Sequence, residues 1–122
     1  MTDGDHATGD VEARLRARLA EVEDRLAAQR RAVEGIVESA RDSNADDEHD
    51  PEGVTLSAEW SRLSALVDAA QSELRQVDDA LARLDAGTYG VCANCGRRIP
   101  AARLKVRPFA ELCVPCAEQA GQ

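Results

Sequence analysis

The sequence predicts an all-α protein, a long antiparallel coiled-coil hairpin followed by a small C-terminal domain with four cysteines and a short terminal helix. Three observations predict this fold. Of the 122 residues, 22 are alanine and only three are aromatic, which suits helices packed along a seam better than one thick core. Two stretches repeat apolar residues at alternating spacings of three and four. Four cysteines stand close together near the C-terminus.

The two heptad stretches predict a helix over residues 11–41 and a second helix over residues 56–86. The seam of the first helix consists of Leu15, Leu19, Val22, Leu26, Gln29, Val33, Ile36 and Ala40. The seam of the second helix consists of Leu56, Trp60, Leu63, Val67, Ala70, Leu74, Val77, Leu81 and Leu84. Residues 1–10 are polar and contain two glycines, so we expect a disordered N-terminal tail there.

In an antiparallel helix pair, the residue numbers of two residues that face each other add to the same value along the whole seam. The two seams can therefore be matched residue by residue. A sum of 96 pairs every residue of the first seam, from Leu15 with Leu81 to Ala40 with Leu56. A sum of 103, one heptad away, is the alternative register, and it leaves Leu56 and Trp60 without partners. Since each seam is occupied by the other, we expect a monomer.

Residues 42–55 form the predicted bend, with Pro51 as a helix breaker and Thr55 or Ser57 as the N-cap of the second helix. The bend carries no basic residue and six acidic ones, namely Asp42, Asp46, Asp47, Glu48, Asp50 and Glu52. Two interpretations stay open at this point. The bend is either a solvated polar loop or a negatively charged tip that meets a basic surface or a protein-bound Mg²⁺.

The charge of the chain is distributed unevenly. The formal net charge is −8 overall, with −11 over residues 1–91 and +3 over residues 92–122. Such an acidic chain is not expected to wrap nucleic acid, since affinity for phosphates comes from Lys and Arg. We also expect no membrane span, because no run of about 18 apolar residues occurs. The polar N-terminus does not resemble a secretory signal, which favours a cytoplasmic location.

The four cysteines form two C-x2-C pairs separated by 17 residues, Cys92-Ala-Asn-Cys95 and Cys113-Val-Pro-Cys116. Two such pairs complete a closed tetrahedral set, as structural Zn²⁺ requires. We therefore expect one Zn²⁺ per chain, held by Cys92, Cys95, Cys113 and Cys116, and no catalytic residue. Two disulfides, four free thiols and a thioredoxin-like redox pair are the alternatives. A reducing cytosol disfavours the disulfides, and no βαβ pattern supports a redox pair.

A specific pattern surrounds the cysteines and consists of Gly87-Thr-Tyr-Gly-Val-Cys-Ala-Asn-Cys-Gly96, Ile99-Pro100, Arg103-Leu104, Arg107-Pro108 and Cys113-Val-Pro-Cys-Ala117. With this pattern, the hairpin and the acidic bend, the chain resembles the DksA/TraR family of RNA polymerase-binding regulators. The resemblance implies a coiled coil inserted into the secondary channel of bacterial RNA polymerase, with its acidic tip near the active centre. It also implies a non-enzymatic regulator that alters promoter-complex stability without sequence-specific DNA binding.

The resemblance assigns roles to individual residues of the bend and of the zinc end. The tip pattern of the family, Asp-x-x-Asp-x-Ala, matches Asp47 and Asp50, with Glu52 in place of the alanine. The implied tip residues near the active centre are Asp47, Glu48, Asp50 and Glu52. The candidate polymerase contacts on the zinc end are Arg97, Arg98, Arg103 and Arg107. Members of the family that respond to ppGpp carry basic side chains where this chain has Ala69, Ser72 and Gln76, which favours no response.

Three other functions stay open for a chain of this pattern. A protein resembling the Gre factors would use the tip carboxylates to hold Mg²⁺ for transcript cleavage, but such proteins carry a β-rich C-terminal domain. A zinc ribbon that binds nucleic acid would use the local positive charge of residues 92–122, although only Tyr89 and Phe109 offer aromatic rings for stacking. A coiled-coil adaptor would use the hairpin alone.

Overall fold

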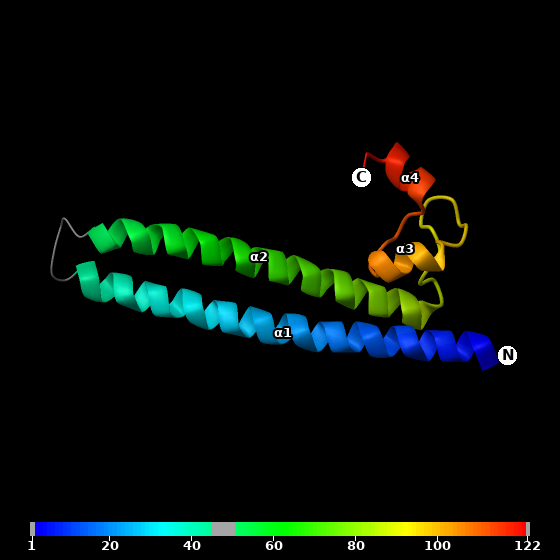
Figure 1. Ribbon diagram of the computed structural model, residues 1–122, viewed down its shortest axis with the longest axis horizontal. Coiled ribbons are helices and arrows are strands. Elements are labelled where there is room, and N and C mark those ends of the chain that lie inside the picture. Colours follow the sequence, from blue (N-terminus) through cyan, green and yellow to red (C-terminus); the bar gives the residue numbers. More distant parts are fainter. Residues whose placement is uncertain (1, 45–50, 122) are drawn as a thin grey trace. The chain divides into compact units, whose positions relative to one another are not determined.

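The computed structural model describes the backbone of residues 2–44 and 51–121 and the side chains of residues 9–42 and 55–121. The helices are α1 (Thr2–Asn44), α2 (Pro51–Ala86), α3 (Ala101–Val106) and α4 (Val114–Gln119). Within the described residues there is no β-strand, and Val91 and Arg98 form an isolated antiparallel bridge. The predicted all-α fold class is confirmed (Figure 1). None of the described helices combines the length and the apolar character needed to span a bilayer.

The first helix starts earlier than predicted. α1 begins at Thr2, so residues 2–10 form its first turns and not a disordered tail. Once a helix has nucleated, each further residue adds one backbone hydrogen bond, and a glycine in the helix costs only about 1 kcal/mol relative to alanine. Gly4 and Gly9 therefore do not prevent α1 from extending beyond the apolar seam.

The second helix also starts earlier than predicted. α1 ends at Asn44 and α2 begins at Pro51, so the break between the helices is shorter than the predicted bend of residues 42–55. Proline suits the first turn of a helix, because its φ is already helical and an N–H at that position would have no partner within the helix. Pro51 therefore begins α2 instead of preceding it, and neither Thr55 nor Ser57 is the N-cap.

The acidic tip residues fall at the edge of the described structure. Asp47, Glu48 and Asp50 lie outside the described residues. Glu52 belongs to the first turn of α2, and its side chain lies outside the described set. Their roles therefore stay predictions.

The chain forms two compact units. One unit is Ala20–Leu74, in which parts of α1 and α2 run antiparallel (Figure 1). Among the described side chains of this unit, the buried apolar ones all lie at predicted seam positions, namely Val22, Leu26, Leu63 and Ala70. The other unit consists of Met1–Leu19 and Arg75–Gln122 and contains all four cysteines. Among its described residues in α1 and α2, the buried ones are Leu15, Val77 and Ala80.

An ion pair identifies the seam register within the Ala20–Leu74 unit. Nη1 of Arg25 in α1 lies 3.2 Å from Oε1 of Glu73 in α2. Both residues stand at heptad position g, which flanks the seam and forms ion pairs between helices. Two residues lie level across the seam when their numbers add to the seam sum. The numbers of Arg25 and Glu73 add to 98, so with a seam sum of 96 the two residues are offset by two positions, about 3 Å along the helix axis. A sum of 103 would displace them by about 7.5 Å, so the ion pair supports the predicted sum of 96.

Gln29 introduces a polar side chain into this seam, at the position that faces Val67. Its Oε1 atom is buried and accepts no hydrogen bond from the described residues. A buried polar atom without a partner costs about 1–3 kcal/mol. Gln29 therefore weakens the packing between α1 and α2 in this unit.

We expect Gln29→Leu to raise the free energy of unfolding by about 1–2 kcal/mol, because the leucine removes the buried oxygen and adds apolar contact across from Val67. Urea denaturation followed by circular dichroism measures this change. Gln29→Glu is the matched control and is expected to lower stability, since it buries a charge at the same place. A leucine variant no more stable than the wild type would contradict the prediction.

Candidate metal centre

A left-handed cap leads the chain from α2 into the cysteine region. α2 ends at Ala86, and Gly87 has a φ of 79°. The amide of Thr88 donates to the carbonyl of Arg83 at 2.8 Å, and the amide of Gly87 donates to Leu84 at 3.2 Å. These two bonds form a Schellman motif, which favours glycine because a Cβ is strained at this φ. The chain therefore leaves the helix axis shortly before the first cysteine pair.

A tight loop closed by an antiparallel bridge presents the first cysteine pair. The amide of Cys92 donates to the carbonyl of Arg97 at 2.8 Å, and the amide of Gly96 donates to the carbonyl of Cys92 at 2.9 Å. Gly96 has a φ of 76°, a left-handed conformation that suits a tight turn at glycine. The loop therefore holds the sulfurs of Cys92 and Cys95 close to each other.

The second cysteine pair lies at the start of α4. Cys113 is the N-cap residue with an extended backbone, and Cys116 lies in the first turn of the helix. The amide of Ala117 donates to the carbonyl of Cys113 at 2.9 Å. The predicted short terminal helix begins at Val114, and Pro115 suits its first turn. Residues three apart share a face of a helix, so this turn directs both thiols to one side.

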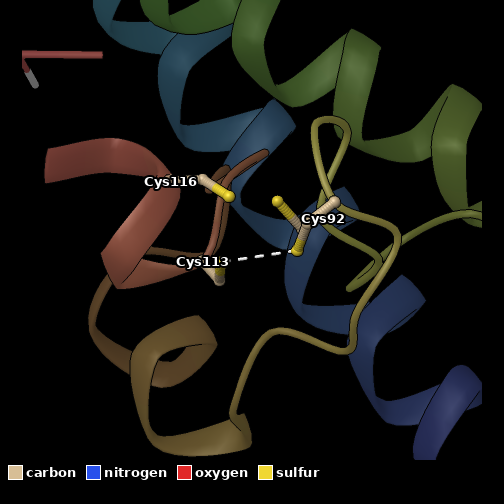
Figure 2. Close-up of side chains that lie close together, drawn as sticks. Cys92, Cys113 and Cys116 are labelled. Carbon is tan, nitrogen blue, oxygen red and sulfur yellow. Dashed lines mark hydrogen bonds between the residues drawn. The ribbon is translucent and has the colours of Figure 1, made fainter. Parts of the chain in front are cut away.

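The four sulfurs form one cluster. All four Sγ atoms lie within 4.8 Å of one another, and those of Cys95 and Cys113 are 3.8 Å apart. Figure 2 shows the side chains of Cys92, Cys113 and Cys116 converging on a common centre. A tetrahedral Zn²⁺ with Zn–S bonds of about 2.3 Å requires sulfurs about 3.8 Å apart. The thiols are free and not joined in disulfides, so the donor set fits zinc in number, chemistry and spacing.

The thiols of Cys92 and Cys116 differ in acidity. Backbone N–H groups of Cys95 and Cys113 donate to Cys92 and lower its pKa to about 6. Cys116 accepts a hydrogen bond from Asn94, which lowers its pKa, but the neighbouring thiols and burial outweigh this bond and raise the pKa to about 12. Metal ligation requires thiolates. The protons that remain on the cluster are therefore released when a metal binds.

Asn94 contacts the cluster without being a candidate ligand. Its Nδ2 atom donates to Sγ of Cys116 at 3.3 Å. A hydrogen bond of this kind orients a ligand sulfur and offsets part of its negative charge. The position of Asn94 between the two cysteines of the first pair is the only sequence signal for this role, and it does not by itself predict the hydrogen bond.

The cysteines are also the core of this small domain. The buried cluster consists of Cys92, Ile99, Cys113 and Cys116, with Leu104 and Leu112 packed against it. Leu104 comes from α3, a helix that the sequence analysis did not predict. So small an apolar core does not stabilise a fold alone, and metal binding and folding are coupled in such domains.

Comparison with known proteins identifies this domain. Residues 87–120 match the family model of the prokaryotic DksA/TraR C4-type zinc finger. The chain therefore contains a segment similar to the DksA/TraR C4-type zinc finger. It is 40% identical over 57 residues to an uncharacterized protein of Aquifex aeolicus, a match that covers 47% of this chain and 39% of the relative. It is 35% identical over 49 residues to the RNA polymerase-binding transcription factor DksA of Haemophilus influenzae, covering 40% of this chain and 34% of the relative.

The chain therefore spans well under half the length of these two curated relatives. Its fold is similar to that of the transcription factor DksA2 from Pseudomonas aeruginosa, with a TM-score of 0.57 and 24% sequence identity. This structural likeness covers 90% of this chain and 84% of DksA2, so it includes the long helices as well as the finger.

A DksA/TraR finger binds zinc, and the four thiols of this finger would hold one ion. When bound, the ion supplies a structural link between the loop of the first cysteine pair and the start of α4. It performs no reaction there, because four thiolates leave no coordination position for water or substrate.

Arg83 joins the four-cysteine finger to the end of α2. Its Nη1 atom lies 2.9 Å from Oε1 of Glu111, and its Nη2 atom donates to the carbonyl of Phe109 at 3.4 Å. The hydroxyl of Tyr89 donates to the carbonyl of Pro108 at 2.8 Å, and burial raises the pKa of Tyr89. These contacts fix residues 108–111, which precede the second cysteine pair, to Arg83 and Tyr89. Sequence patterns carry no signal for contacts between residues so far apart in the chain.

We expect a double-mutant cycle of Arg83→Met and Glu111→Gln to give a coupling of about 0.5–1 kcal/mol. Exposed ion pairs contribute about 0.2–1 kcal/mol, and the Arg83 side chain is only 19% exposed, which places this pair toward the upper end. Denaturation of the zinc-loaded single and double variants measures the coupling. Additive effects of the two substitutions would show that the pair does not stabilise the finger.

The four arginines predicted as contact residues differ in their surroundings. Arg103 is half-buried, and its Nε atom donates to the carbonyl of Leu112 at 3.0 Å. It therefore supports the backbone next to Cys113. Arg97, Arg98 and Arg107 are exposed.

Proposed function

We propose that this chain is a transcription regulator without catalytic activity of its own, which binds bacterial RNA polymerase through the secondary channel. The observation that carries the proposal is the presence, in one chain, of a DksA/TraR finger and two long antiparallel helices. The Haemophilus influenzae relative is by its name an RNA polymerase-binding transcription factor. The DksA2 fold supports the same architecture for the helices.

In this proposal the segment between α1 and α2 acts near the polymerase active centre. Asp47 and Asp50 are the acting groups, and Glu48 and Glu52 add negative charge beside them. Carboxylates attract basic side chains and are good ligands for Mg²⁺, and either target suits a polymerase active centre. Their action changes the stability of promoter complexes. The acidic bend is then a functional tip and not only a solvated loop.

The finger contributes contacts outside the channel. Arg97, Arg98 and Arg107 are exposed and available to a partner. Arg103 is a weaker candidate, because its Nε atom is engaged by Leu112 within the finger. The finger therefore docks on the rim of the polymerase through a basic surface while the tip enters the channel.

The same proposal covers the remaining expectations for the chain. It works as a monomer in the bacterial cytoplasm, without sequence-specific DNA binding. The uncharged residues Ala69, Ser72 and Gln76 offer no cations to ppGpp, so we propose action independent of this nucleotide. Transcript cleavage in the manner of the Gre factors is less well supported, because residues 87–120 form a four-cysteine finger and not a β-rich domain.

Photo-crosslinking to purified bacterial RNA polymerase tests the proposed function. A benzophenone amino acid at Ala45, in the bend, is expected to crosslink to polymerase segments that line the secondary channel. The same group at Ala102, an exposed residue of α3, is expected to crosslink to the outer rim. Crosslinks from Ala45 to any other surface, or no polymerase crosslinks at all, would contradict the proposal.

A further inference from the structure

Trp60 is a seam residue that the seam does not bury. The side chain at this position of α2 is 46% exposed, although Leu63, one seam position later, is only 8% exposed. Seam residues Val22 and Ala70 of the same unit are almost completely buried. A tryptophan is larger than the space between two helices at a single seam position, so much of the indole faces solvent. This indole is the only one in the chain.

A second exposed apolar residue lies on the same side of the helix pair. In the register with a sum of 96, Trp60 faces Ile36, and the next residue, Val37, is 36% exposed. Trp60 stands at heptad position a and Val37 at position e, and both positions border the side opposite the ion pair of Arg25 with Glu73. Trp60 and Val37 therefore form one apolar patch, which we call the indole patch.

The charge around the indole patch indicates what kind of surface can cover it. Residues 20–74 contain 14 acidic and five basic residues, a formal net charge of −9. A second copy of this chain would bring two such segments together, which like-charge repulsion disfavours. A partner with basic residues around an apolar pocket has complementary charge. Tryptophan is also among the residues that most often dominate binding energy at protein interfaces.

We propose that the indole patch is an anchor by which the helix pair binds RNA polymerase, with Trp60 inserted into an apolar pocket rimmed by basic side chains. This inference rests on the proposed function. It assigns affinity for polymerase to Trp60, whereas the acidic tip changes transcription. Trp60 lies in α2, ten residues after Asp50 in the sequence. Binding and regulation are then separable functions of neighbouring segments.

Trp60→Leu tests the anchor, because leucine keeps an apolar residue in the seam and removes the exposed indole. We expect it to weaken binding to polymerase by about tenfold or more, the usual effect at an interface hot spot. The matched control is Leu66→Ala, which removes an exposed apolar side chain (38% exposed) at position g, on the opposite side. This control is expected to bind within about twofold of the wild type, and circular dichroism checks that both variants keep their helices.

Fluorine NMR of the chain labelled with 5-fluorotryptophan provides a direct second readout. The single tryptophan gives one resonance, and unlabelled polymerase gives none. On addition of polymerase we expect this resonance to shift and to lose its sensitivity to exchange of H₂O for D₂O. A resonance that stays solvent-sensitive in the complex, or a Trp60→Leu variant that binds as tightly as the wild type, would overturn the anchor and leave the proposed function intact.

Two further outcomes separate the possible failures. If the wild-type chain does not bind polymerase at all, the proposed function and the anchor both fail. If sedimentation shows a dimer that Trp60→Leu dissociates, the occupant of the indole patch is a second copy of the chain and the polymerase anchor is wrong.

Discussion

Replacing Cys113 with serine is expected to abolish zinc binding and to unfold the finger. Cys113 supplies one of four sulfurs that lie within 4.8 Å of one another, and it is also the N-cap of α4 and part of the buried cluster. Structural zinc contributes about 10–16 kcal/mol to the folding of small fingers. Residues 87–121 have little other apolar burial, so we expect no folded finger without the ion. The Ala20–Leu74 unit contains no cysteine and is expected to stay helical.

The zinc content of the purified variant, measured by mass spectrometry or a chromogenic chelator, reports the loss directly. Limited proteolysis is expected to cleave the finger of Cys113→Ser and to spare the long helices. Ala93→Ser is the matched control, because it places the same side chain at an exposed position within the first cysteine pair. It is expected to keep one zinc per chain. Retention of equimolar zinc and a protease-resistant finger in Cys113→Ser would contradict the metal centre.

Neutralising both tip aspartates is expected to remove the effect on transcription while leaving polymerase binding largely unchanged. The double substitution Asp47→Asn and Asp50→Asn keeps the size of the side chains and removes two of the six carboxylates between residues 42 and 52. If these charges act at the active centre, in vitro transcription from a responsive promoter becomes insensitive to the protein. We expect the affinity for polymerase to change by less than about threefold, because buried anchor residues such as the proposed Trp60 contribute more to affinity than charged side chains at the edge of an interface.

A charge-matched control distinguishes a specific tip from a general electrostatic effect. Glu34→Gln with Glu38→Gln removes two exposed carboxylates of α1 and is expected to leave regulation intact. Transcription assays and binding measurements are performed at the same ionic strength, since charge interactions at this surface are screened by salt. Equal loss of binding and regulation in the tip variant would show that the tip serves docking only. Robust transcript cleavage by the wild type would favour the Gre-like alternative.

Much of this structure was predictable from local patterns. The alternating apolar spacings predicted two long helices, and Val22, Leu26, Leu63 and Ala70 are buried where the seams require them. The left-handed conformation of Gly87 followed from its place after the last seam residue. The spacing of the cysteines predicted a closed set of four thiols, which the structure brings together.

Other features depended on contacts that no local pattern reports. The predicted register gained support from a contact in the fold through the ion pair of Arg25 with Glu73, 48 residues apart. The exposure of Trp60 was not predictable either, since heptad spacing assigns a residue to the seam without measuring whether its side chain fits there. α3 was missed because its six residues are too few to show a helical period.

Periodicity and ligand spacing act between residues close together in the chain, so the amino-acid order alone specifies the two heptad helices, the thiol set and the glycine stop. The surroundings of each arginine depend on residues that folding brings close to it. Arg83 of α2 forms an ion pair with Glu111, Arg103 donates to the carbonyl of Leu112, and Arg97 is exposed. The physical reason is that burial and hydrogen bonding are properties of the space around a side chain, and that space is filled by residues distant in sequence.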